Sequence, residues 1–206
     1  MTPSNLRVRI VAADDEPDTR RFFQEVLPHL GHEVLGVVGS GRELIERCRA
    51  TQPDVVIAEV QLPDMDGFQA AAEVNREREV PFIMVSGQQH CDLAGKAGAN
   101  YLMAYLTKPV KPADLAAALA LARQRFAQFQ AARREATELR QALEERKLIE
   151  RAKGIVIRRV GIDEQEAFRR LRKLSSDRNM KLIDVARTVL SAEEVFTDLE
   201  TVAFHR

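Results

Sequence analysis

Short apolar runs alternate with longer amphipathic stretches over the first 120 residues of this 206-residue chain. The runs are rich in Val, Ile and Leu and end at turn-forming residues, a pattern typical of buried strands. We expect strands near residues 7–13, 33–38, 54–59, 81–86 and 101–107. We expect helices near residues 17–30, 40–50, 67–77 and 90–98, and a further helix from residue 112 onward. This alternation predicts an α/β fold: a doubly wound five-stranded parallel sheet with helices on both faces.

The pattern becomes purely helical after Pro112. No glycine or proline follows until Gly154, and Ala, Leu, Glu, Arg and Gln dominate, so one long helix is expected as far as residue 156. An apolar stripe on this helix alternates spacings of three and four residues and comprises Phe129, Ala132, Ala136, Leu139 and Leu143. Such a stripe predicts either a coiled coil between two copies of the chain or packing against the chain's own C-terminal part.

A small three-helix all-α unit is expected at residues 147–192. Asp163 and Glu166 resemble a capping box that starts its second helix. Phe168 is assigned to the apolar face of that helix, and Asn179 to the cap of the third helix. The unit is therefore expected to bury a miniature apolar core and to leave its polar residues in solvent.

The predicted organisation has four parts: a first domain at residues 1–120, a helical linker at 121–146, the three-helix unit at 147–192, and a tail at 193–206 that is either a loose helix or disordered. The formal net charge is zero, but the first 120 residues hold 12 Lys/Arg against 17 Asp/Glu, a net charge of −5. Residues 140–187 hold 14 against 8, a net charge of +6. This asymmetry predicts different partners for the two domains, the alternative being two ordinary solvated surfaces.

Nothing in the sequence predicts a membrane or secreted protein. No apolar stretch approaches the roughly 20 residues that span a bilayer, and the N-terminus shows no secretory signal. The two cysteines, Cys48 and Cys91, are too few for a disulfide framework and lack the spacing of a metal site, so free thiols are expected. We therefore expect a cytoplasmic protein with no membrane partner.

Polar side chains follow the predicted strands at the points where they end. Asp14 and Asp15 follow the first strand, Glu59 ends the third, Ser86 ends the fourth and Lys108 follows the fifth. Because ligand sites of such folds lie at the carboxyl ends of the strands, we expect these side chains to form one site. The three carboxylates are hard oxygen ligands suited to Mg²⁺, and Lys108 and Ser86 can bind a phosphoryl oxygen or a carboxylate.

Together these positions resemble the receiver domain of bacterial two-component response regulators over residues 6–120. The resemblance also rests on the turn Leu62-Pro63…Asp66-Gly67 and on the run Tyr105-Leu106-Thr107-Lys108-Pro109. It implies a flavodoxin-like fold, phosphorelay signal transduction from a histidine kinase, and a bound Mg²⁺. The residue roles that it implies are the phosphoacceptor position Glu59, the metal ligands Asp14, Asp15 and Glu59, and the switch and phosphate-contacting residues Ser86, Tyr105 and Lys108.

Glu59 departs from the family, which has an aspartate at the phosphoacceptor position. The extra methylene moves the carboxylate outward, and a displacement of about 1 Å can cost on the order of 100-fold in a positioned reaction. We therefore predict a phosphorylation-independent receiver. Two arrangements of the site remain open: a retained Mg²⁺, or a direct ion pair between Glu59 and Lys108 without metal.

A second departure precedes Lys108. The stretch from residue 100 to residue 107, which contains the last predicted strand, is about three residues longer than in the usual receiver pattern. Tyr105 fits the switch aromatic by its distance from Lys108, but Tyr101 could compete for the role. In the turn after the third strand, Asp64 and Asp66 are either turn-forming acids or substitute phosphoacceptors.

The C-terminal unit resembles an ANTAR domain over residues 140–192. The resemblance rests on the string Arg146-Lys147-Leu148-Ile149-Glu150-Arg151-Ala152-Lys153-Gly154-Ile155, on Ala167-Phe168 and on Leu182…Val185-Ala186. This family comprises RNA-binding regulators of transcription antitermination, and the resemblance implies binding to paired hairpins in leader transcripts. The basic side chains expected to contact RNA are Arg151, Lys153, Arg158, Arg159, Arg178 and Lys181.

An alternative function from another class is a constitutive protein- or DNA-binding regulatory module. It stays open because aromatic residues for base stacking are nearly absent among the basic residues of the C-terminal unit. An enzyme is not expected, since no nucleophile–base pair and no phosphate-cradling glycine loop occurs. Gly39-Ser40-Gly41 is too short for such a loop and is typical of a turn before a helix.

Overall fold

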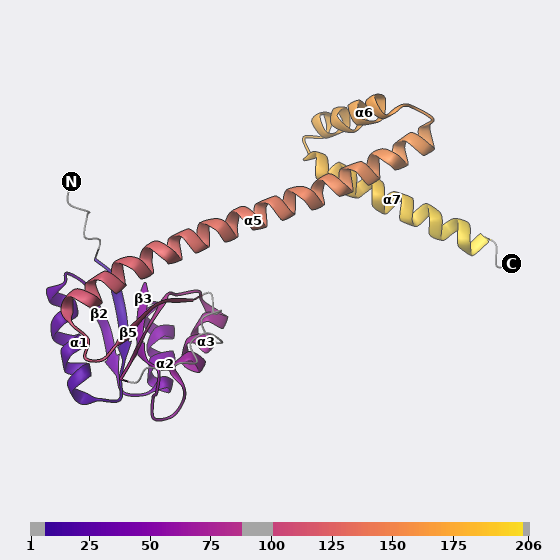
Figure 1. The fold of residues 1–206 in the computed structure, drawn as a ribbon. Helices are drawn as coiled ribbons and strands as arrows, with labels where there is room; N and C mark the ends of the chain where they lie inside the picture. Colours follow the sequence, from indigo (N-terminus) through magenta and orange to yellow (C-terminus); the bar gives the residue numbers. More distant parts are fainter. Residues whose placement is uncertain (1–6, 88–100, 204–206) are drawn as a thin grey trace, which may run out of the picture. The chain divides into compact units, whose positions relative to one another are not determined.

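The computed structural model describes residues 7–87 and 101–203. The chain divides into two compact units, Met1–Ala131 and Ala132–Arg206. The long helix α5 (Pro112–Val160) belongs to both, because it begins in the first unit and ends in the second (Figure 1).

The first unit holds a five-stranded parallel sheet with the order β2-β1-β3-β4-β5. This order is the flavodoxin-like one, which confirms the predicted fold class. The strands are β1 (Arg9–Ala13), β2 (Glu33–Val38), β3 (Val55–Glu59), β4 (Phe82–Ser86) and β5 (Leu102–Thr107). The described helices are α1 (Pro17–His29), α2 (Gly41–Thr51), α3 (Gly67–Glu77) and the first part of α5. The helix expected at 90–98 lies outside the described residues.

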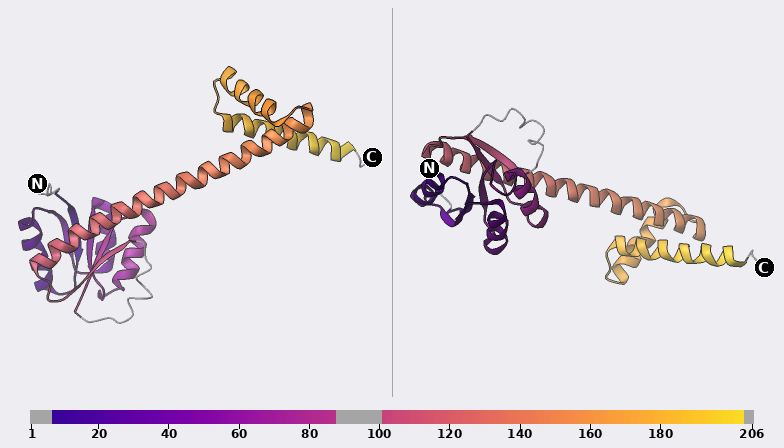
Figure 2. Two further views of the ribbon diagram at one scale, coloured as in Figure 1. Left: turned by 45° about the horizontal axis from the view of Figure 1, so that its top comes forward. Right: turned by 90° about the horizontal axis from the view of Figure 1, so that it is seen from below.

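Apolar cores lie on both faces of the sheet, because successive side chains of a strand point to opposite faces. On one face, Val11 of β1 packs in a cluster with Leu44 of α2 and residues of α3. On the other face, Ile10 packs with Phe23 of α1 and Leu119 of α5. Figure 2 shows the sheet between these helices. Covered faces explain why the strands are near-continuous apolar runs rather than alternating ones.

The last strand contains a bulge. Phe82 pairs with Leu102, but the next residue of β4 pairs with Ala104, so Met103 is an extra residue in β5. The Met103 side chain is buried, and its carbonyl oxygen accepts a hydrogen bond of 3.1 Å from Arg125 of α5. The bulge accommodates one residue of the extra length that the sequence shows before Lys108.

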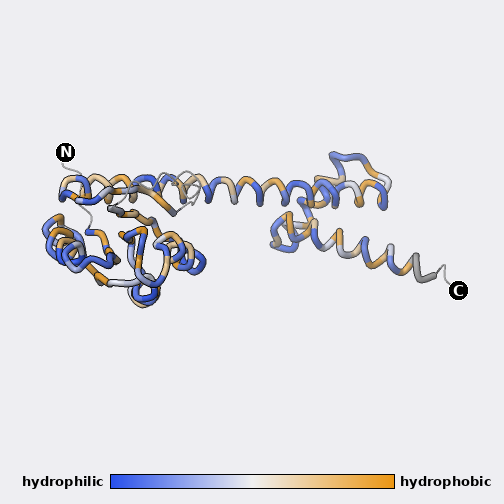
Figure 3. The backbone as a smooth tube through the Cα atoms, turned by 60° about the horizontal axis from the view of Figure 1, so that its bottom comes forward, coloured by the Kyte–Doolittle hydropathy of each residue, from blue (hydrophilic) through white to orange (hydrophobic). Residues whose placement is uncertain are grey.

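The second unit packs the C-terminal part of α5 with α6 (Glu164–Asp177) and α7 (Leu182–Ala203). Its buried apolar residues are small or branched, and Figure 3 shows apolar and polar positions alternating along its helices. They are Ala152, Ile155, Ala167, Leu171, Ile183, Val185 and Ala186. Among the described residues, no helix combines the length and apolar character needed to cross a membrane.

The boundaries of α6 and α7 confirm one expectation, correct a second and decide between the two alternatives left open for the tail. The Asp163 carboxylate accepts a 2.8 Å hydrogen bond from the Glu166 amide and caps α6, as predicted. Asn179 does not cap α7. With a φ of 51° it ends α6, and its amide donates to the Ser176 carbonyl at 3.1 Å, because asparagine tolerates the left-handed conformation that terminates helices. Over residues 193–203 the C-terminal tail continues α7 and is helical; the last three residues lie outside the described part of the chain.

The apolar stripe of the linker does not pack within the second unit. Leu139 and Leu143 belong to that unit, and their side chains are 65% and 55% exposed. This contradicts packing of these two residues against the chain's own C-terminal part. A coiled coil between two copies stays a prediction.

Gly67, the first residue of α3, lets the helix start against the end of β3. A Cβ atom at this position would lie 2.2 Å from the carbonyl oxygen of Glu59, far inside van der Waals contact. The Gly67 amide also donates a 2.8 Å hydrogen bond to the Val60 carbonyl. The glycine thus sets how closely the turn after β3 can fold over the candidate site.

We predict that Gly67→Ala lowers the free energy of unfolding by about 1–3 kcal/mol, because backbone atoms must move to admit the methyl group. Urea unfolding of the full chain, followed by far-UV circular dichroism, measures the change. Gly39→Ala is the matched control: its nearest obstacle is the flexible guanidinium of Arg20 at 3.4 Å, and we expect a change below about 1 kcal/mol. Equal effects of the two substitutions would contradict the prediction.

Candidate functional site

One ammonium group binds three carboxylates at the carboxyl end of the sheet. Lys108 Nζ lies 2.8 Å from Glu59 Oε2, 2.9 Å from Asp14 Oδ2 and 3.0 Å from Glu16 Oε2. These four residues follow or end β1, β3 and β5, and we call them the lysine-centred cluster. The convergence of strand ends that the sequence pattern predicts is therefore present, with Glu16 as an additional member.

Both oxygens of the Glu59 carboxylate are engaged. Oε2 binds Lys108, and Oε1 accepts hydrogen bonds from the backbone amides of Val60 at 2.8 Å and Gln61 at 3.3 Å. The residue is only 4% exposed. One oxygen of the glutamate therefore binds the backbone that follows β3, and the other binds the lysine.

Burial and ion pairing act in opposite directions on the charges of the cluster. Burial disfavours the charged form of Asp14 and raises the pKa of its carboxyl group, although Lys108 and the Glu16 amide partly offset this. Burial also opposes the charge of Lys108, but hydrogen bonds to Glu59, Asp14 and Glu16 outweigh it and raise the lysine pKa above its ordinary value. The exposed Glu16 has a lowered pKa because Lys108, and then Thr19, bond to its charged form.

The predicted magnesium ligands do not fit a metal ion in this arrangement. Asp14 is fully buried, and its Oδ2 lies beside Lys108 without hydrogen-bond geometry. Asp15 is exposed, and Glu59 is committed to Lys108 and to backbone amides. Across the described ranges, no three His, Cys, Asp or Glu side chains are placed to hold a metal. The direct Glu59–Lys108 ion pair, one of the two arrangements left open by the sequence, is present.

Ser86 and Tyr105 lie next to the cluster on β4 and β5. Ser86 is 2% exposed and pairs with Thr107, and its carbonyl oxygen accepts a 2.8 Å hydrogen bond from the Lys108 amide. Tyr105 lies within β5, three residues before Lys108, and pairs with Met84. Their roles as phosphate-contacting residue and switch aromatic stay predictions.

Tyr101, the competing aromatic, is held at the start of β5. Its ring packs edge-on against Phe82, with 6.0 Å between the ring centroids. Its carbonyl oxygen accepts a 2.8 Å hydrogen bond from the Phe82 amide. Burial raises the pKa of the Tyr101 hydroxyl, and the negative charge of Asp66 adds to the effect.

The two acids in the turn after β3 act as helix caps. Asp66 accepts a 2.7 Å hydrogen bond from the Phe68 amide at the start of α3. Asp64 accepts hydrogen bonds of 2.7 and 3.0 Å from the amides of Gly41 and Arg42 at the start of α2. The Asp66 contact supports a turn-forming role, whereas Asp64 ties the turn to the start of α2. The role of Asp64 was not visible in the sequence, because its partners lie more than 20 residues away.

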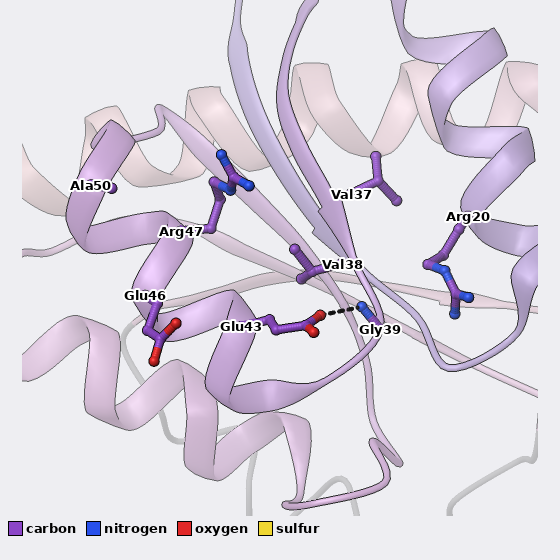
Figure 4. A pocket seen from close by; sticks show the side chains of 8 residues that line it. All are labelled: Arg20, Val37, Val38, Gly39, Glu43, Glu46, Arg47 and Ala50. Atoms are coloured by element: carbon purple, nitrogen blue, oxygen red, sulfur yellow. Dashed lines mark hydrogen bonds between the residues drawn. The ribbon is translucent and has the colours of Figure 1, made fainter.

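Arg20 is a member of the site that sequence reasoning missed. From α1 its Nη1 donates to the carbonyl oxygens of Asp14 at 2.8 Å and Asp15 at 2.7 Å. It also lines a pocket beside the end of β2, where Glu43 of α2 accepts a 2.9 Å hydrogen bond from the Gly39 amide (Figure 4). No predicted site residue lines that pocket. The arginine fixes the backbone that carries the acidic pair.

In the second unit, the predicted RNA-contacting residues fall into two groups. Lys153 and Arg159 are engaged by acids. Lys153 is 8% exposed and forms ion pairs with Glu150 and with Glu164, the latter at 2.7 Å. Arg159 pairs with Glu193 at 2.9 Å. Four others are exposed and form no ion pair within the described part of the chain: Arg151, Arg158, Arg178 and Lys181.

Comparison with known proteins identifies both units. The family model of the response regulator receiver domain matches residues 10–120, and that of the ANTAR domain matches residues 137–190. The transcriptional regulatory protein PdtaR of Mycobacterium tuberculosis is 36% identical over 182 residues, which cover 88% of this chain and 89% of that protein.

Solved structures agree for the first unit. A response regulator receiver domain protein from Clostridium thermocellum is 28% identical, with a TM-score of 0.52, over 57% of this chain and 94% of that one. The chemotaxis protein CheY4 of Vibrio cholerae, at 24% identity and a TM-score of 0.53, shows the same fold over 56% of this chain and 98% of that one.

The chain therefore belongs to the response regulators that join a receiver domain to an ANTAR domain. These are non-enzymatic regulators, and their output domain binds RNA to control transcription antitermination. A receiver domain implies a kinase partner.

The raised pKa of Asp14 gives the cluster a testable pH dependence. A carboxyl group whose pKa is raised by folding stabilises the fold most at pH values below its ordinary pKa, here 3.8, and that contribution is lost as the pH rises through the folded-state pKa. We predict that Asp14→Asn, which is permanently neutral, raises the free energy of unfolding at neutral pH and gives no gain below pH 3.8.

Urea unfolding of the full chain at both pH values measures this difference. Asp15→Asn is the control, because Asp15 is exposed and its change should stay within about 0.5 kcal/mol. A lower free energy of unfolding for Asp14→Asn than for the wild type at neutral pH would contradict the prediction.

Proposed function

We propose that this response regulator controls transcription antitermination by binding hairpins in leader RNA through the basic face of its ANTAR unit, in the cytoplasm, where transcripts are made. We propose further that its receiver works independently of phosphorylation. The observation that carries the second proposal is the engagement of both Glu59 oxygens, by Lys108 on one side and by two backbone amides on the other.

The chemistry of phosphoryl transfer supports this reading of Glu59. A phosphoacceptor must present a free carboxylate oxygen in line with the leaving group. The Glu59 oxygens are instead bonded, and the residue is nearly buried. In the ion pair, the Glu59 carboxylate places one negative charge beside the Lys108 ammonium. A phosphoryl group at about pH 7 carries a larger negative charge, of about 1.5 to 2. The receiver is thus proposed to hold one partly active-like state.

The phosphorylation state of Glu59 can be measured directly by intact-protein mass spectrometry. After incubation of the full chain with acetyl phosphate and Mg²⁺, we expect no phosphoryl adduct. Glu59→Asp, which withdraws the carboxylate by one methylene, is the matched variant and is expected to gain the adduct. A wild-type adduct that Glu59→Gln abolishes would refute phosphorylation independence.

RNA binding is supported by the exposed, unpaired cations of the second unit. Each cation that neutralises a phosphate contributes to the salt dependence of the association constant, with a slope of about 0.7–0.9 per contact on a log–log plot. Lys153 differs, because it lies between Glu150 and Glu164 and joins α5 to α6. We propose that it positions α6 in place of the direct RNA contact expected from the sequence, and the salt slope distinguishes the two roles.

We predict that Arg151→Gln and Arg158→Gln each weaken binding to a two-hairpin leader RNA and each reduce the salt slope by about 0.7–0.9. Lys153→Met should weaken binding with an unchanged slope. Fluorescence anisotropy titrations at several salt concentrations provide both quantities. Lys111→Gln, an exposed lysine of the first unit, is the control and should change neither.

These titrations also separate the proposal from its alternative. Binding to a protein partner, or to duplex DNA in preference to the hairpin RNA, would favour a constitutive protein- or DNA-binding module. Wild-type protein that fails to bind the hairpin RNA at low salt would count against the RNA-binding proposal itself.

A further inference from the structure

We infer that Phe168 of α6 is a stacking platform for an unpaired base of the bound RNA. The inference rests on the proposed function and goes beyond it, because it adds a base contact to a surface otherwise described by its phosphate-binding cations. It also corrects an expectation from the sequence. Phe168 was assigned to the apolar core face of α6, but its side chain is 39% exposed.

The core of the second unit does not need this ring. Ala167 is fully buried and Leu171 is 3% exposed, and these two residues, four apart, mark the face of α6 that packs inward. Phe168 follows Ala167 by about 100° around the helix, which turns its ring toward the edge of the solvated face. A residue outside the packed face is available to a partner.

An arginine lies against the exposed ring. Arg172 is one helical turn further along α6, and its guanidinium carbon lies 5.9 Å from the centroid of the Phe168 ring. This distance is within the range of a cation–π contact. A flat aromatic ring beside a guanidinium group is an arrangement that RNA-binding proteins use for splayed bases, with the arginine free to contact the adjoining phosphate.

The charges around Phe168 favour RNA over an apolar protein partner. Arg172 and Lys173 on α6, and Arg178 at its C-cap, are exposed and form no ion pair with a described residue. Glu166 is the nearest acid in sequence, and two arginines already neutralise it: Arg169 and Arg170. One arginine thus lies against the ring, and the two acids within four residues of it, Glu164 and Glu166, are both in ion pairs, which favours a nucleic-acid partner.

A second exposed phenylalanine provides the contrast within the same unit. Phe196 of α7 is 56% exposed and has the Arg159 guanidinium 5.6 Å from its ring centroid. Its neighbours along α7 are acidic, with Glu193, Glu194 and Asp198 within three residues, and Glu193 already pairs with Arg159. Phosphates would be repelled there. Phe196 therefore serves as the matched control for an exposed ring beside an arginine.

The first test replaces the ring while keeping the charges. Stacking of one base contributes about 1–3 kcal/mol when measured by alanine substitution, so Phe168→Ala should weaken binding to the two-hairpin RNA by about 5- to 150-fold. Phe168→Leu, which keeps an apolar side chain without a π face, should lose nearly as much, and Phe168→Tyr should bind like wild type. None should alter the salt slope, because no phosphate contact is removed. Phe196→Ala should leave affinity unchanged.

The second test looks for the stacked base itself. With 2-aminopurine placed in turn at each loop position, one position should show fluorescence quenching on binding to wild type and to Phe168→Tyr, but not to Phe168→Leu. At that position an abasic RNA should bind wild type and Phe168→Ala with equal affinity, since base and ring act as a pair. Thermal unfolding of each variant by circular dichroism checks that α6 is intact.

The outcomes are distinct. If wild type binds the RNA but Phe168→Leu binds equally well, or if no loop position is quenched by the ring, the inference is wrong while the RNA-binding function stands. If Phe168→Ala weakens binding to the abasic RNA as strongly as to the intact RNA, the ring is structural and the inference is again wrong. If wild type does not bind the RNA at all, the proposed RNA-binding function is wrong, and the inference that rests on it is wrong with it.

Discussion

The contact of the Lys108 ammonium with three carboxylates is the interaction on which the receiver site depends. Asp14, Glu16 and Glu59 come from two strand ends, and without a cation between them their negative charges would repel one another at close range. Burial makes this requirement stricter, because a buried charge needs a partner. The hydrogen bond from the Lys108 amide to the Ser86 carbonyl fixes where that cation stands. The lysine side chain thereby occupies the space among the acids and takes up the oxygens that the family would offer to a metal ion and to phosphate.

The substitution of glutamate for aspartate changes this site through length rather than charge. Both residues carry one carboxylate, but the longer side chain lets one Glu59 oxygen bond the Val60 amide while the other remains on Lys108. Three contacts thus engage the carboxylate, one on Oε2 and two on Oε1. Phosphoryl transfer to Glu59 would require one of these oxygens to leave its present partner.

The basic unit shows that a count of positive charges overestimates the surface open to a polyanion. Fourteen Lys/Arg lie within residues 140–187, yet Lys153 is buried between acids, Arg169 and Arg170 share Glu166, and Arg159 is held by α7. The Lys153–Glu164 and Arg159–Glu193 pairs join α5 to α6 and to α7, whereas the two Glu166 pairs lie within α6. The other exposed cations are fewer than the count suggests, and one of them, Arg172, lies against the exposed ring of Phe168 on α6. The chain passes from the first unit to the second within α5.

The sequence by itself determined the α/β first domain, the bounds of its described strands and of α1, α2 and α3 to within about two residues, the long helix and the helical C-terminal unit. These follow from local patterns: apolar runs, helical spacing, and caps such as Asp163, whose partners lie within a few residues. It also placed Asp14, Glu59, Ser86 and Lys108 at strand ends. The tertiary structure alone decided what those residues bond to. Glu16 and Arg20 joined the site, Asp64 capped a distant helix, Asn179 ended one helix instead of starting the next, Lys153 was buried, and Phe168 faced solvent. Apart from Asn179, whose amide bonds to Ser176 three residues earlier, these outcomes depend on contacts that no local spacing reports, because burial and pairing are properties of the packed chain.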